Sequence, residues 1–498
     1  KSWDFYKYDP IQQIFHHHHL PWNKSFFSYF FMIHILESMK INFNSKKYIV
    51  NQNSKISNVI SKFEQNNLNI AIVESNKKEF LGIITLSDLK KAFFKGASTN
   101  QKITNFFNKD PLYLKGKINE NSVSNILSSS KFNNIDPPLI PIFNEKNKLI
   151  DIIDKYTLFN YPTKSFLRKD STSAKKILIV GGAGYIGSVL VEQLIKLNYE
   201  VTVYDKFIYN SKKSFENYFK KDNVKVIKGD SQDISKIFEA IRKNDIVVHL
   251  AEMVGDPLCE KKPKKTYAVN YLASITISNI CKNLGINKFI YVSSCSVYGS
   301  NDNLTNELSN INPLSIYAKL KALSEKAIIR NIDKNCQPCI LRLGTVYGSS
   351  FRPRYDLVVN LFSGLLANKK KITIAGGDQW RPFVHVKDVG RAIIKVLNSD
   401  FKKTNNQIFN IVGENIQIKD IGKLIKKINP KVDIVFSKTS VDKRNYKSSN
   451  NKAQKLLKFK TKFTIKDGIK EVVDYTKKNK IKNIFNKKYI NILNHFKF

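Results

Sequence analysis

The chain has 498 residues, 42% of them hydrophobic, and at about 100–200 residues per domain this length predicts two to four domains. The composition supports buried cores and excludes a fully disordered protein. Lys and Arg number 83 against 41 Asp and Glu, a formal net charge of +42 that favours anionic partners. The lysines are nevertheless scattered among Asn, Ile and Phe, as AT-rich coding produces. Neither zinc-finger spacing nor an RNA-binding aromatic motif accompanies them, so we expect no nucleic-acid binding.

The cysteines are odd in number and irregular in spacing; they are Cys259, Cys281, Cys295, Cys336 and Cys339. This pattern predicts a reducing compartment, the cytoplasm, and no disulfide framework. The last two form a C-x-x-C pair without a second pair or histidines nearby, so we expect no metal site. A membrane span needs about 20 consecutive apolar residues, and the sequence holds no such run.

We expect residues 1–45 to form an extension outside the fold. The apolar stretch at 26–36 is too short for a membrane span, and it lacks the basic start and small-residue cleavage site of a signal peptide. The four histidines at 16–19 suggest a tag remnant or translated upstream sequence. Met39 opens a segment of ordinary composition.

Residues 46–160 contain an internal repeat. Two apolar strands of the first copy, at 69–74 and 80–85, recur in the second copy at 139–143 and 148–153, with an offset of 69 residues. A helical stretch precedes the strands in each copy. Because each copy alone would leave an apolar face open, we expect the two copies to pair.

A polar stretch at 161–173, with Pro and Ser, predicts a linker. Residues 174–498 then alternate apolar strands with helical stretches, beginning with KILIV at 176–180. The following strands are expected in EVTVYD, VKVIKGD, DIVVHLA, KFIYVSS and CILRLGTVYG. Continuous apolar strands separated by helices are typical of a parallel sheet covered on both faces, so the predicted fold class is α/β.

A glycine-rich turn, GGAGYIG at 181–187, follows the first of these strands and opens a helix. Gly181, Gly184 and Gly187 give the spacing G-x-x-G-x-x-G, which lets the backbone approach a pyrophosphate at the helix N-terminus. Asp205 ends the next strand, where a carboxylate accepts hydrogen bonds from ribose hydroxyls and repels a 2′-phosphate. The sequence therefore predicts a dinucleotide site that prefers NAD to NADP.

A candidate catalytic set follows further along the chain. Tyr317 and Lys321 form a Y-x-x-x-K pair one helical turn apart, so their side chains share a face. Ser294 ends the expected strand KFIYVSS and could hold a reacting oxygen. A free tyrosine has a pKa of about 10, which a neighbouring Lys and a positively charged nicotinamide would lower. The three residues are therefore candidates for acid–base chemistry beside a dinucleotide.

With these motifs in place, residues 174–498 resemble the extended short-chain dehydrogenase/reductases of the NAD-dependent sugar-nucleotide epimerase/dehydratase family. The matching segments are GGAGYIG, KGD, HLAE, SSCSVYG, YAKLK and WRPFVHVKD. The resemblance implies a Rossmann-type doubly wound parallel sheet with a smaller C-terminal substrate subdomain, NAD as cofactor, and Ser294, Tyr317 and Lys321 as catalytic residues. The cofactor-binding residues that it implies are Gly181, Gly184, Tyr185, Ile186, Gly187, Asp205, Asp230, Ser231, Leu250, Ala251, Asn270, Tyr317 and Lys321.

The resemblance also implies substrate contacts through Thr345, Asn360, Arg381 and Arg444. It places the two arginines against the substrate diphosphate, where guanidinium forks suit phosphate oxygens. Two departures from the family pattern stand out. Thr345 occupies the position where 4-epimerases of the UDP-galactose type commonly have Asn, and Glu252 replaces the usual small residue after HLA.

Cys295 and Ser296 are the most informative departure. In the 4,6-dehydratases of the family these positions hold an Asp–Glu pair, and in the sugar-acid decarboxylases the second holds Glu. A dehydration needs an acid and a base at carbons 5 and 6 of the sugar. Because Ser296 cannot readily supply either, a 4-epimerase is favoured.

GIITLSDL in the first N-terminal copy resembles a CBS domain, a module that occurs in pairs and often binds adenine nucleotides. The resemblance implies an α+β CBS pair over 46–160, with Thr85 on the phosphate and Asp88 on the ribose of AMP or ATP. The second copy holds Asp154 and Thr157 at the same positions, so at most one such site is intact. A purely structural dimerisation pair is the alternative.

Together these features predict an NAD-dependent epimerase of a nucleotide-activated sugar, with Tyr317 as the base. We expect it to be a cytoplasmic homodimer that serves cell-surface polysaccharide biosynthesis. The alternatives are a sugar-nucleotide dehydratase or reductase, and a non-catalytic protein that senses NAD and adenine nucleotide. The intact catalytic set favours the enzyme. Carbon 4 is the family's usual site, while the nucleoside, the sugar and the stereocentre stay open.

Overall fold

The computed structural model divides the chain into two compact units, Lys1–Pro162 and Thr163–Phe498. The residues that it describes are 44–66, 68–116, 122–123, 125–126, 129, 131–132, 135, 139–155, 158, 176–286, 288–330, 336–437 and 444–491. Nearly all of the expected N-terminal extension, with the histidines at 16–19, lies outside the described residues, as do the expected linker at 161–173 and Thr157.

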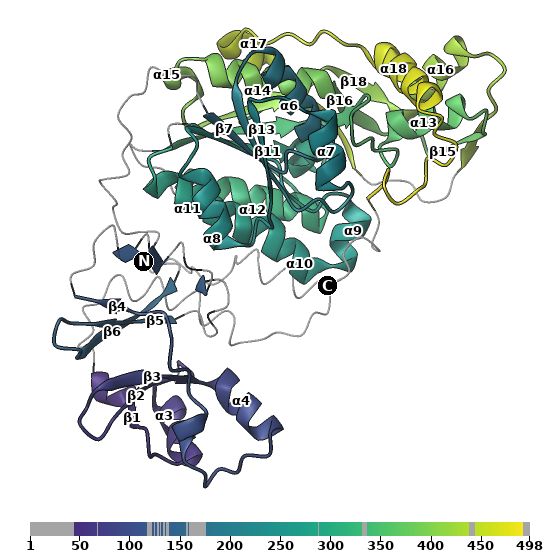
Figure 1. The fold of residues 1–498 in the computed structure, drawn as a ribbon. Coiled ribbons are helices and arrows are strands. Elements are labelled where there is room, and N and C mark those ends of the chain that lie inside the picture. The colour runs from purple at the N-terminus through teal and green to yellow at the C-terminus, as the bar shows by residue number, and fades with distance from the viewer. Residues whose placement is uncertain are drawn as a thin grey trace, which may run out of the picture. The chain divides into compact units, whose positions relative to one another are not determined.

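The N-terminal unit contains two three-stranded sheets of the same topology (Figure 1). The first is formed by β1 (Ile49–Asn51), β2 (Ile70–Glu74) and β3 (Phe80–Thr85). The second is formed by β4 (Leu114–Lys115), β5 (Leu139–Phe143) and β6 (Leu149–Asp154). In each sheet the first two strands are parallel and the last two antiparallel. The helices whose bounds lie within the described residues are η2 (Ser45–Lys47), α3 (Ile56–Asn66), α4 (Leu86–Phe94) and η3 (Ile103–Asn105).

The strand register shows that the two copies are repeats of one unit. Ile72 lies opposite Ile83 in the first hairpin, and Pro141 lies opposite Ile152 in the second, which confirms the predicted offset of 69 residues. A common apolar core joins the two sheets and contains Ile70, Ile72, Ile83, Leu139, Phe143 and Leu149. The faces that each copy would leave open therefore cover each other, as expected.

The second unit is built on a seven-stranded sheet in the order β17-β13-β11-β10-β7-β8-β9. Every neighbouring pair is parallel. The strands are β7 (Lys176–Val180), β8 (Glu200–Asp205), β9 (Val224–Lys228), β10 (Ile246–His249), β11 (Lys288–Ser294), β13 (Gln337–Leu343) and β17 (Gln407–Ile411). Runs such as ILIV at 177–180 are fully buried because both faces of the sheet are covered. The predicted doubly wound parallel sheet is confirmed.

Helices cover the two faces of this sheet (Figure 1). On one face lie α6 (Tyr185–Lys196) and α14 (Val386–Asn398), whose apolar residues share a core with the strands. The helices of the other face are α8 (Ile234–Ile241), α11 (Ala273–Asn283) and α12 (Ile316–Arg330). Shorter helices are α7 (Lys212–Tyr218), α9 (Asp256–Lys261), α10 (Pro263–Thr266), the π-helix η7 (Tyr267–Leu272) and η8 (Cys295–Tyr298). Among the described residues no helix is both long and apolar enough to cross a membrane.

A smaller C-terminal part has an apolar core of its own, which includes Phe362, Ile374, Phe383, Ile421 and Ile469. Its strands and those that border it are β12 (Ser300–Thr305), β14 (Thr345–Tyr347), β15 (Ile372–Ala375), β16 (Trp380–His385), β18 (Glu414–Gln417), β19 (Ile434–Ser437) and β20 (Asn445–Ser448). They pair as β12-β20, β14-β16-β18 and β15-β19. The helices of this part are α13 (Val358–Ala367), α16 (Ile418–Ile428) and α18 (Ile465–Lys478). Two further helices are α15 (Phe401–Thr404), which precedes β17, and α17 (Asn451–Leu457), whose buried residues join the core of the large sheet.

The strand order of the large sheet reverses at β7. From β7 the chain continues through β8 and β9 on one side, and then crosses to β10 on the other side. Val180 at the end of β7 lies opposite His249 at the end of β10. In doubly wound sheets, ligands bind outside the carboxyl ends of the strands at such a switch point. The segments that follow these two strands, 181–187 and 250–252, should therefore frame the site.

Candidate active site

The glycine turn between β7 and α6 has no room for side chains. Gly181 has a φ of +87°, and a Cβ there would lie 2.6 Å from the backbone nitrogen of Ala251. A Cβ on Gly187 would lie 2.5 Å from the carbonyl oxygen of Gly181. The turn therefore exposes bare backbone at the N-terminus of α6, where free N–H groups and the helix dipole favour a phosphate.

A cavity of about 130 Å³ opens beside this turn. The predicted cofactor residues that line it are Gly181, Gly184, Asp205, Asp230, Ser231, Leu250 and Ala251. Gly187 does not line it and instead lets α6 pack closely against the turn. These residues fit a dinucleotide, because they combine a bare turn for the pyrophosphate with the Asp205 carboxylate for the ribose.

Asp205 is held in place by the backbone around it. Its Oδ2 accepts a hydrogen bond from the N–H of Ala183 at 3.0 Å, and its Oδ1 accepts one from Phe207 at 2.7 Å. Burial raises the pKa of Asp205, and the two N–H donors oppose this rise. Each carboxylate oxygen can accept a second hydrogen bond, so the carboxylate can also receive ribose hydroxyls.

A second and larger cavity, of about 590 Å³, lies over the carboxyl ends of β11 and β13. It brings together all three predicted catalytic residues, Ser294, Tyr317 and Lys321. Tyr185, Ile186 and Leu250 of the predicted cofactor set also line it, so cofactor and catalytic residues meet in one space. Ser294 accepts a hydrogen bond from the N–H of Ser296 at 3.1 Å, which holds its hydroxyl at the end of β11.

Lys321 is engaged in a buried ion pair. Its Nζ lies 2.6 Å from a carboxylate oxygen of Glu252, and both side chains are at most 5% exposed. Its Nζ also donates a hydrogen bond to the carbonyl oxygen of Val292. Burial raises the pKa of Tyr317 well above its ordinary value, and the negative charge of Glu252 adds to this rise. The lowered pKa expected from the Lys neighbour is therefore not found, chiefly because Tyr317 is buried and in addition because Glu252 is close by.

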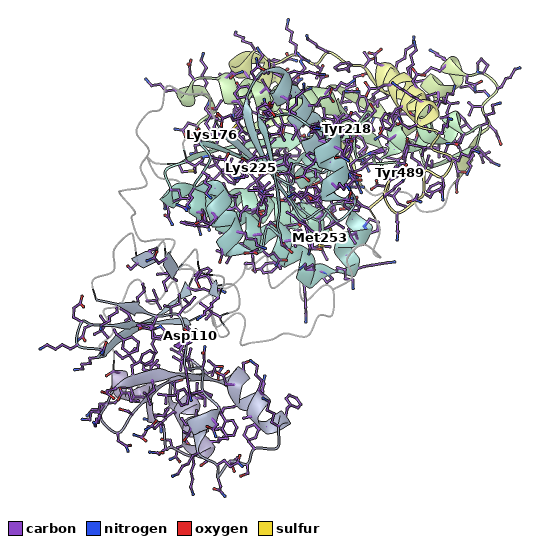
Figure 2. The ribbon with its side chains drawn as sticks, viewed as in Figure 1. Asp110, Lys176, Tyr218, Lys225, Met253 and Tyr489 are labelled. Carbon is purple, nitrogen blue, oxygen red and sulfur yellow. The ribbon has the colours of Figure 1, made fainter. Side chains whose placement is uncertain are left out.

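Asn270 supports the site from the π-helix η7. Its side chain accepts a hydrogen bond from the N–H of Met253 at 2.8 Å and donates one to the carbonyl oxygen of Met253 at 2.8 Å. Met253, labelled in Figure 2, directly follows Glu252 in the sequence and is buried. Asn270 therefore lines neither cavity but fixes the segment that follows Ala251 and Glu252.

The two predicted phosphate arginines converge on the larger cavity. Arg381 lies on β16 and Arg444 directly precedes β20, and both line the cavity together with Thr345. The Arg381 guanidinium donates hydrogen bonds to the carbonyl oxygens of Trp380 and Arg444. Arg444 pairs with Asp256 at 2.7 Å. Residues 63 positions apart are thereby joined at one edge of the cavity.

Asn360 takes a different place from the one expected. It is 2% exposed and does not line the cavity. Its Oδ1 accepts a hydrogen bond from the N–H of Gly348, and its Nδ2 donates to the hydroxyl of Tyr185 at 3.0 Å and to the carbonyl oxygen of Arg354. The structure thus uses Asn360 to position cavity residues rather than to face a ligand.

Several lining residues were missed by the sequence analysis. Arg354 and Asp356 form an ion pair at 2.6 Å on the cavity wall, and Asp256 also lines it. The segment RPRYD at 352–356 begins four residues after Gly348 of VYG and could have drawn attention by its two arginines. Glu252 was noted as a departure, but its partner could not be seen because 69 residues separate it from Lys321.

Comparison with known proteins agrees with this geometry. A family model described as the NAD dependent epimerase/dehydratase family matches residues 177–412, and a CBS domain model matches residues 42–95. A protein of Methanocaldococcus jannaschii, provisionally assigned as a UDP-glucose 4-epimerase, is 30% identical over 312 residues; the match covers 61% of this chain and 99% of that protein. The chain belongs to the NAD-dependent epimerase/dehydratase family.

Other members of the family act on related substrates. The dTDP-D-glucose 4,6-dehydratase of Mus musculus is 32% identical over 327 residues, covering 61% of this chain and 90% of the mouse protein. The crystal structure of UDP-glucuronic acid 4-epimerase from Bacillus cereus, in complex with UDP-glucuronic acid and NAD, has a TM-score of 0.56 and 28% identity, covering 61% and 99% of the two chains. Members of this family thus include both epimerases and dehydratases, and the expectation of NAD as the family's cofactor is confirmed.

The cofactor preference can be measured directly. We expect the protein to bind NAD at least about tenfold more tightly than NADP, because the Asp205 carboxylate repels a 2′-phosphate. Asp205→Asn should lower the ratio of NAD affinity to NADP affinity, since it keeps the size of the side chain and removes the charge. Fluorescence titrations with both dinucleotides give the ratio. Equal or tighter binding of NADP by the unaltered protein would contradict the role of Asp205.

In the N-terminal unit, Thr85 and Asp88 bond to each other. The Thr85 hydroxyl donates to Asp88 Oδ2 at 2.8 Å, and the same oxygen accepts the N–H of Thr85 at 3.0 Å, which forms a capping box at the start of α4. The T-x-x-D motif therefore caps the N-terminus of α4. Asp154 ends β6 in the second copy, while its partner Thr157 lies outside the described residues.

Proposed function

We propose that the protein is an NAD-dependent 4-epimerase of a UDP-activated sugar. The observation that carries this proposal is the single cavity in which Ser294, Tyr317 and Lys321 face two arginines. A UDP group is chosen because related 4-epimerases bind UDP-sugars. NAD bound at the glycine turn would accept a hydride from the sugar carbon and return it.

The residues of the chain would divide the remaining work. Tyr317, as phenolate, takes the proton of the sugar's 4-hydroxyl while the hydride leaves carbon 4, and returns the proton after the 4-keto sugar has turned over. Ser294 donates a hydrogen bond to the reacting oxygen. Arg381 and Arg444 bind the diphosphate and hold the nucleotide while the sugar rotates. The hydride returns to the opposite face, so the net reaction is an epimerisation without loss of cofactor.

The residues after Ser294 favour epimerisation over dehydration. Cys295 is fully buried, its thiol donates to the carbonyl oxygen of Arg342 at 3.3 Å, and burial raises its pKa to about 12. Ser296 lines the cavity, and its hydroxyl has no hydrogen-bond partner among the described residues. A hydroxyl can bind a sugar but is a poor acid and base at neutral pH, whereas loss of water from carbons 5 and 6 needs both.

A panel of sugar nucleotides tests the proposal. The full chain is incubated with NAD and UDP-glucose, UDP-glucuronic acid or dTDP-glucose, and the products are separated by chromatography and identified by NMR. We expect the 4-epimer of a UDP-sugar, without net formation of NADH. A 4-keto-6-deoxy product would make the protein a dehydratase. NAD binding without turnover of any sugar nucleotide would favour the sensing protein.

We also propose one adenine-nucleotide site in the first CBS copy. Asp88 lines up with the residue that the family places on the ribose, and its Oδ1 accepts no hydrogen bond among the described residues. A fused sensor changes activity if its ligand binds two states of the protein differently. The alternative is a pair that serves dimerisation alone.

Calorimetry on the full chain tests this site. With the Rossmann site saturated by NAD, AMP or ATP should give binding heat, and Asp88→Ala should weaken the binding by at least about tenfold because a charged hydrogen bond is lost. Asp467→Ala is the matched control, since it breaks the same kind of capping box at α18. Absence of heat at millimolar nucleotide, or equal loss in both variants, would leave the pair as a structural element.

A further inference from the structure

Glu252 occupies the junction between the two cavities. It lies three residues after His249, the last residue of β10, and it lines both the cavity beside the glycine turn and the cavity of the catalytic set. Its side chain is 2% exposed. A carboxylate at this depth is costly unless it is paired and hydrogen-bonded, so its partners should indicate its task.

Those partners come from the catalytic helix and the strand beneath it. Lys321 of α12 lies 2.6 Å away, and the hydroxyl of Tyr291 on β11 donates to the other carboxylate oxygen at 2.7 Å. Tyr291 is fully buried, and the Lys321 ammonium lies 4.7 Å above its ring centre. Asn270 clamps the next residue, Met253, through both of its backbone polar groups. The carboxylate is therefore held rigidly against Lys321.

This ion pair changes how the Lys321 ammonium affects the ionisation of Tyr317. The Lys321 ammonium lies 5.8 Å from the ring centre of Tyr317. An isolated ammonium at that distance would favour the phenolate of Tyr317, since an opposite charge favours the charged form. A carboxylate in contact with the ammonium cancels most of its field, because the buried pair is neutral as a whole.

We propose that Glu252 is a positioning residue that neutralises Lys321 and so keeps Tyr317 protonated until cofactor is bound. This inference rests on the proposed function, because it concerns the base of that reaction. Proton removal from the sugar is then confined to the cofactor-loaded protein, in which a positively charged nicotinamide supplies the charge that Glu252 cancels. A small apolar residue at this position could not exert this control.

The other titratable and charged groups around the pair come from four elements and the segment that follows β14. They are His249 of β10, Tyr291 of β11, Tyr317 of α12, Asp256 and Cys259 of α9, and Arg354. Burial lowers the pKa of His249 to about 3 and raises that of Cys259 to about 12, so both are neutral near pH 7. Asp256 pairs with Arg444 and Arg354 with Asp356, which leaves Glu252 as the carboxylate in contact with Lys321.

A tyrosinate titration of the full chain, without substrate or cofactor, tests the proposal. The ultraviolet absorbance of tyrosinate is followed against pH in the unaltered protein and in Glu252→Gln. The curve of the same protein carrying Tyr317→Phe is then subtracted from each, so that the difference reports Tyr317. Far-UV circular dichroism sets the pH limit below which the protein stays folded. We expect Tyr317 to ionise about one to two pH units lower in Glu252→Gln than in the unaltered protein. Coincident curves would overturn the proposal.

Removal of both charges gives an independent control. In the double variant Lys321→Met with Glu252→Gln, Tyr317 should ionise at nearly the same pH as in the unaltered protein. The reason is that a neutral ion pair has been replaced by two neutral side chains. Tyr291→Phe keeps both charges and should also leave the pKa of Tyr317 unchanged. If either control shifts Tyr317 as much as Glu252→Gln alone does, packing rather than charge is responsible and the proposal fails. The titration involves no sugar nucleotide, so its failure is distinct from failure of the 4-epimerase assignment.

Discussion

Tyr317→Phe should reduce kcat by about 10²- to 10⁴-fold, the usual contribution of a positioned acid–base group, and leave the Kd for NAD nearly unchanged. The substitution removes the phenolic oxygen and keeps the ring, which packs beside Met253 and Leu258. The measurement combines initial rates with a sugar nucleotide and a fluorescence titration with NAD. Because proton transfer is lost while the cofactor site is intact, the effect should fall on kcat.

A buried tyrosine outside the cavity serves as the control. The Tyr355 hydroxyl shares a hydrogen bond of 2.7 Å with Thr476 on α18, and Tyr355 does not line the cavity. Tyr355→Phe should therefore retain turnover within a few-fold. Full activity in Tyr317→Phe, or equal loss in both variants, would rule out Tyr317 as the base.

Arg342→Met should lower the free energy of unfolding of the catalytic unit by about 3–5 kcal/mol, the usual cost of removing one partner of a buried ion pair. Arg342 on β13 and Glu325 on α12 are at most 5% exposed and lie 2.7 Å apart. The guanidinium also donates to the hydroxyl of Tyr298 at 2.8 Å. Without it, the Glu325 carboxylate stays buried with the Ser293 hydroxyl as its remaining close partner in the described residues.

Urea denaturation followed by circular dichroism measures this loss. Arg342→Met with Glu325→Leu is the matched control, because it removes both charges and leaves no carboxylate stranded. This double variant should be more stable than Arg342→Met alone, as expected for a buried pair replaced by apolar side chains. An unchanged midpoint in Arg342→Met would show that the pair contributes little to the stability of the fold.

The sequence predicted well the strands, the glycine turn and the helix that carry the site. The patterns that indicate these elements lie within short stretches of the chain. A buried parallel strand needs a continuous apolar run, and a pyrophosphate turn needs glycines at fixed spacing, so KILIV and GGAGYIG could be recognised directly. Tyr317 and Lys321 are one helical turn apart and had to share a face. The repeat was also visible, because the register of its two hairpins follows the same spacing in sequence.

The partners of these residues could not be predicted in the same way. Asn360 was expected on the substrate, but the fold directs its amide to Gly348 and Tyr185. Arg352 and Arg354 drew no prediction, although Arg354 lines the cavity. The contacts of these residues depend on how the helices and loops of the C-terminal part pack against the sheet. No short-range pattern in the sequence predicts that packing.

The sequence by itself determined the parallel sheet, the glycine turn and the paired N-terminal repeat, and it named the residues that we propose as the catalytic set. The tertiary structure alone decided the electrostatic state of that set. Glu252 and Lys321 meet because the segment after β10 lies against the first turns of α12. Arg381 reaches the backbone of Arg444 because β16 lies beside the segment that leads into β20. Charge interactions depend on distance in space, whereas sequence patterns report distance along the chain.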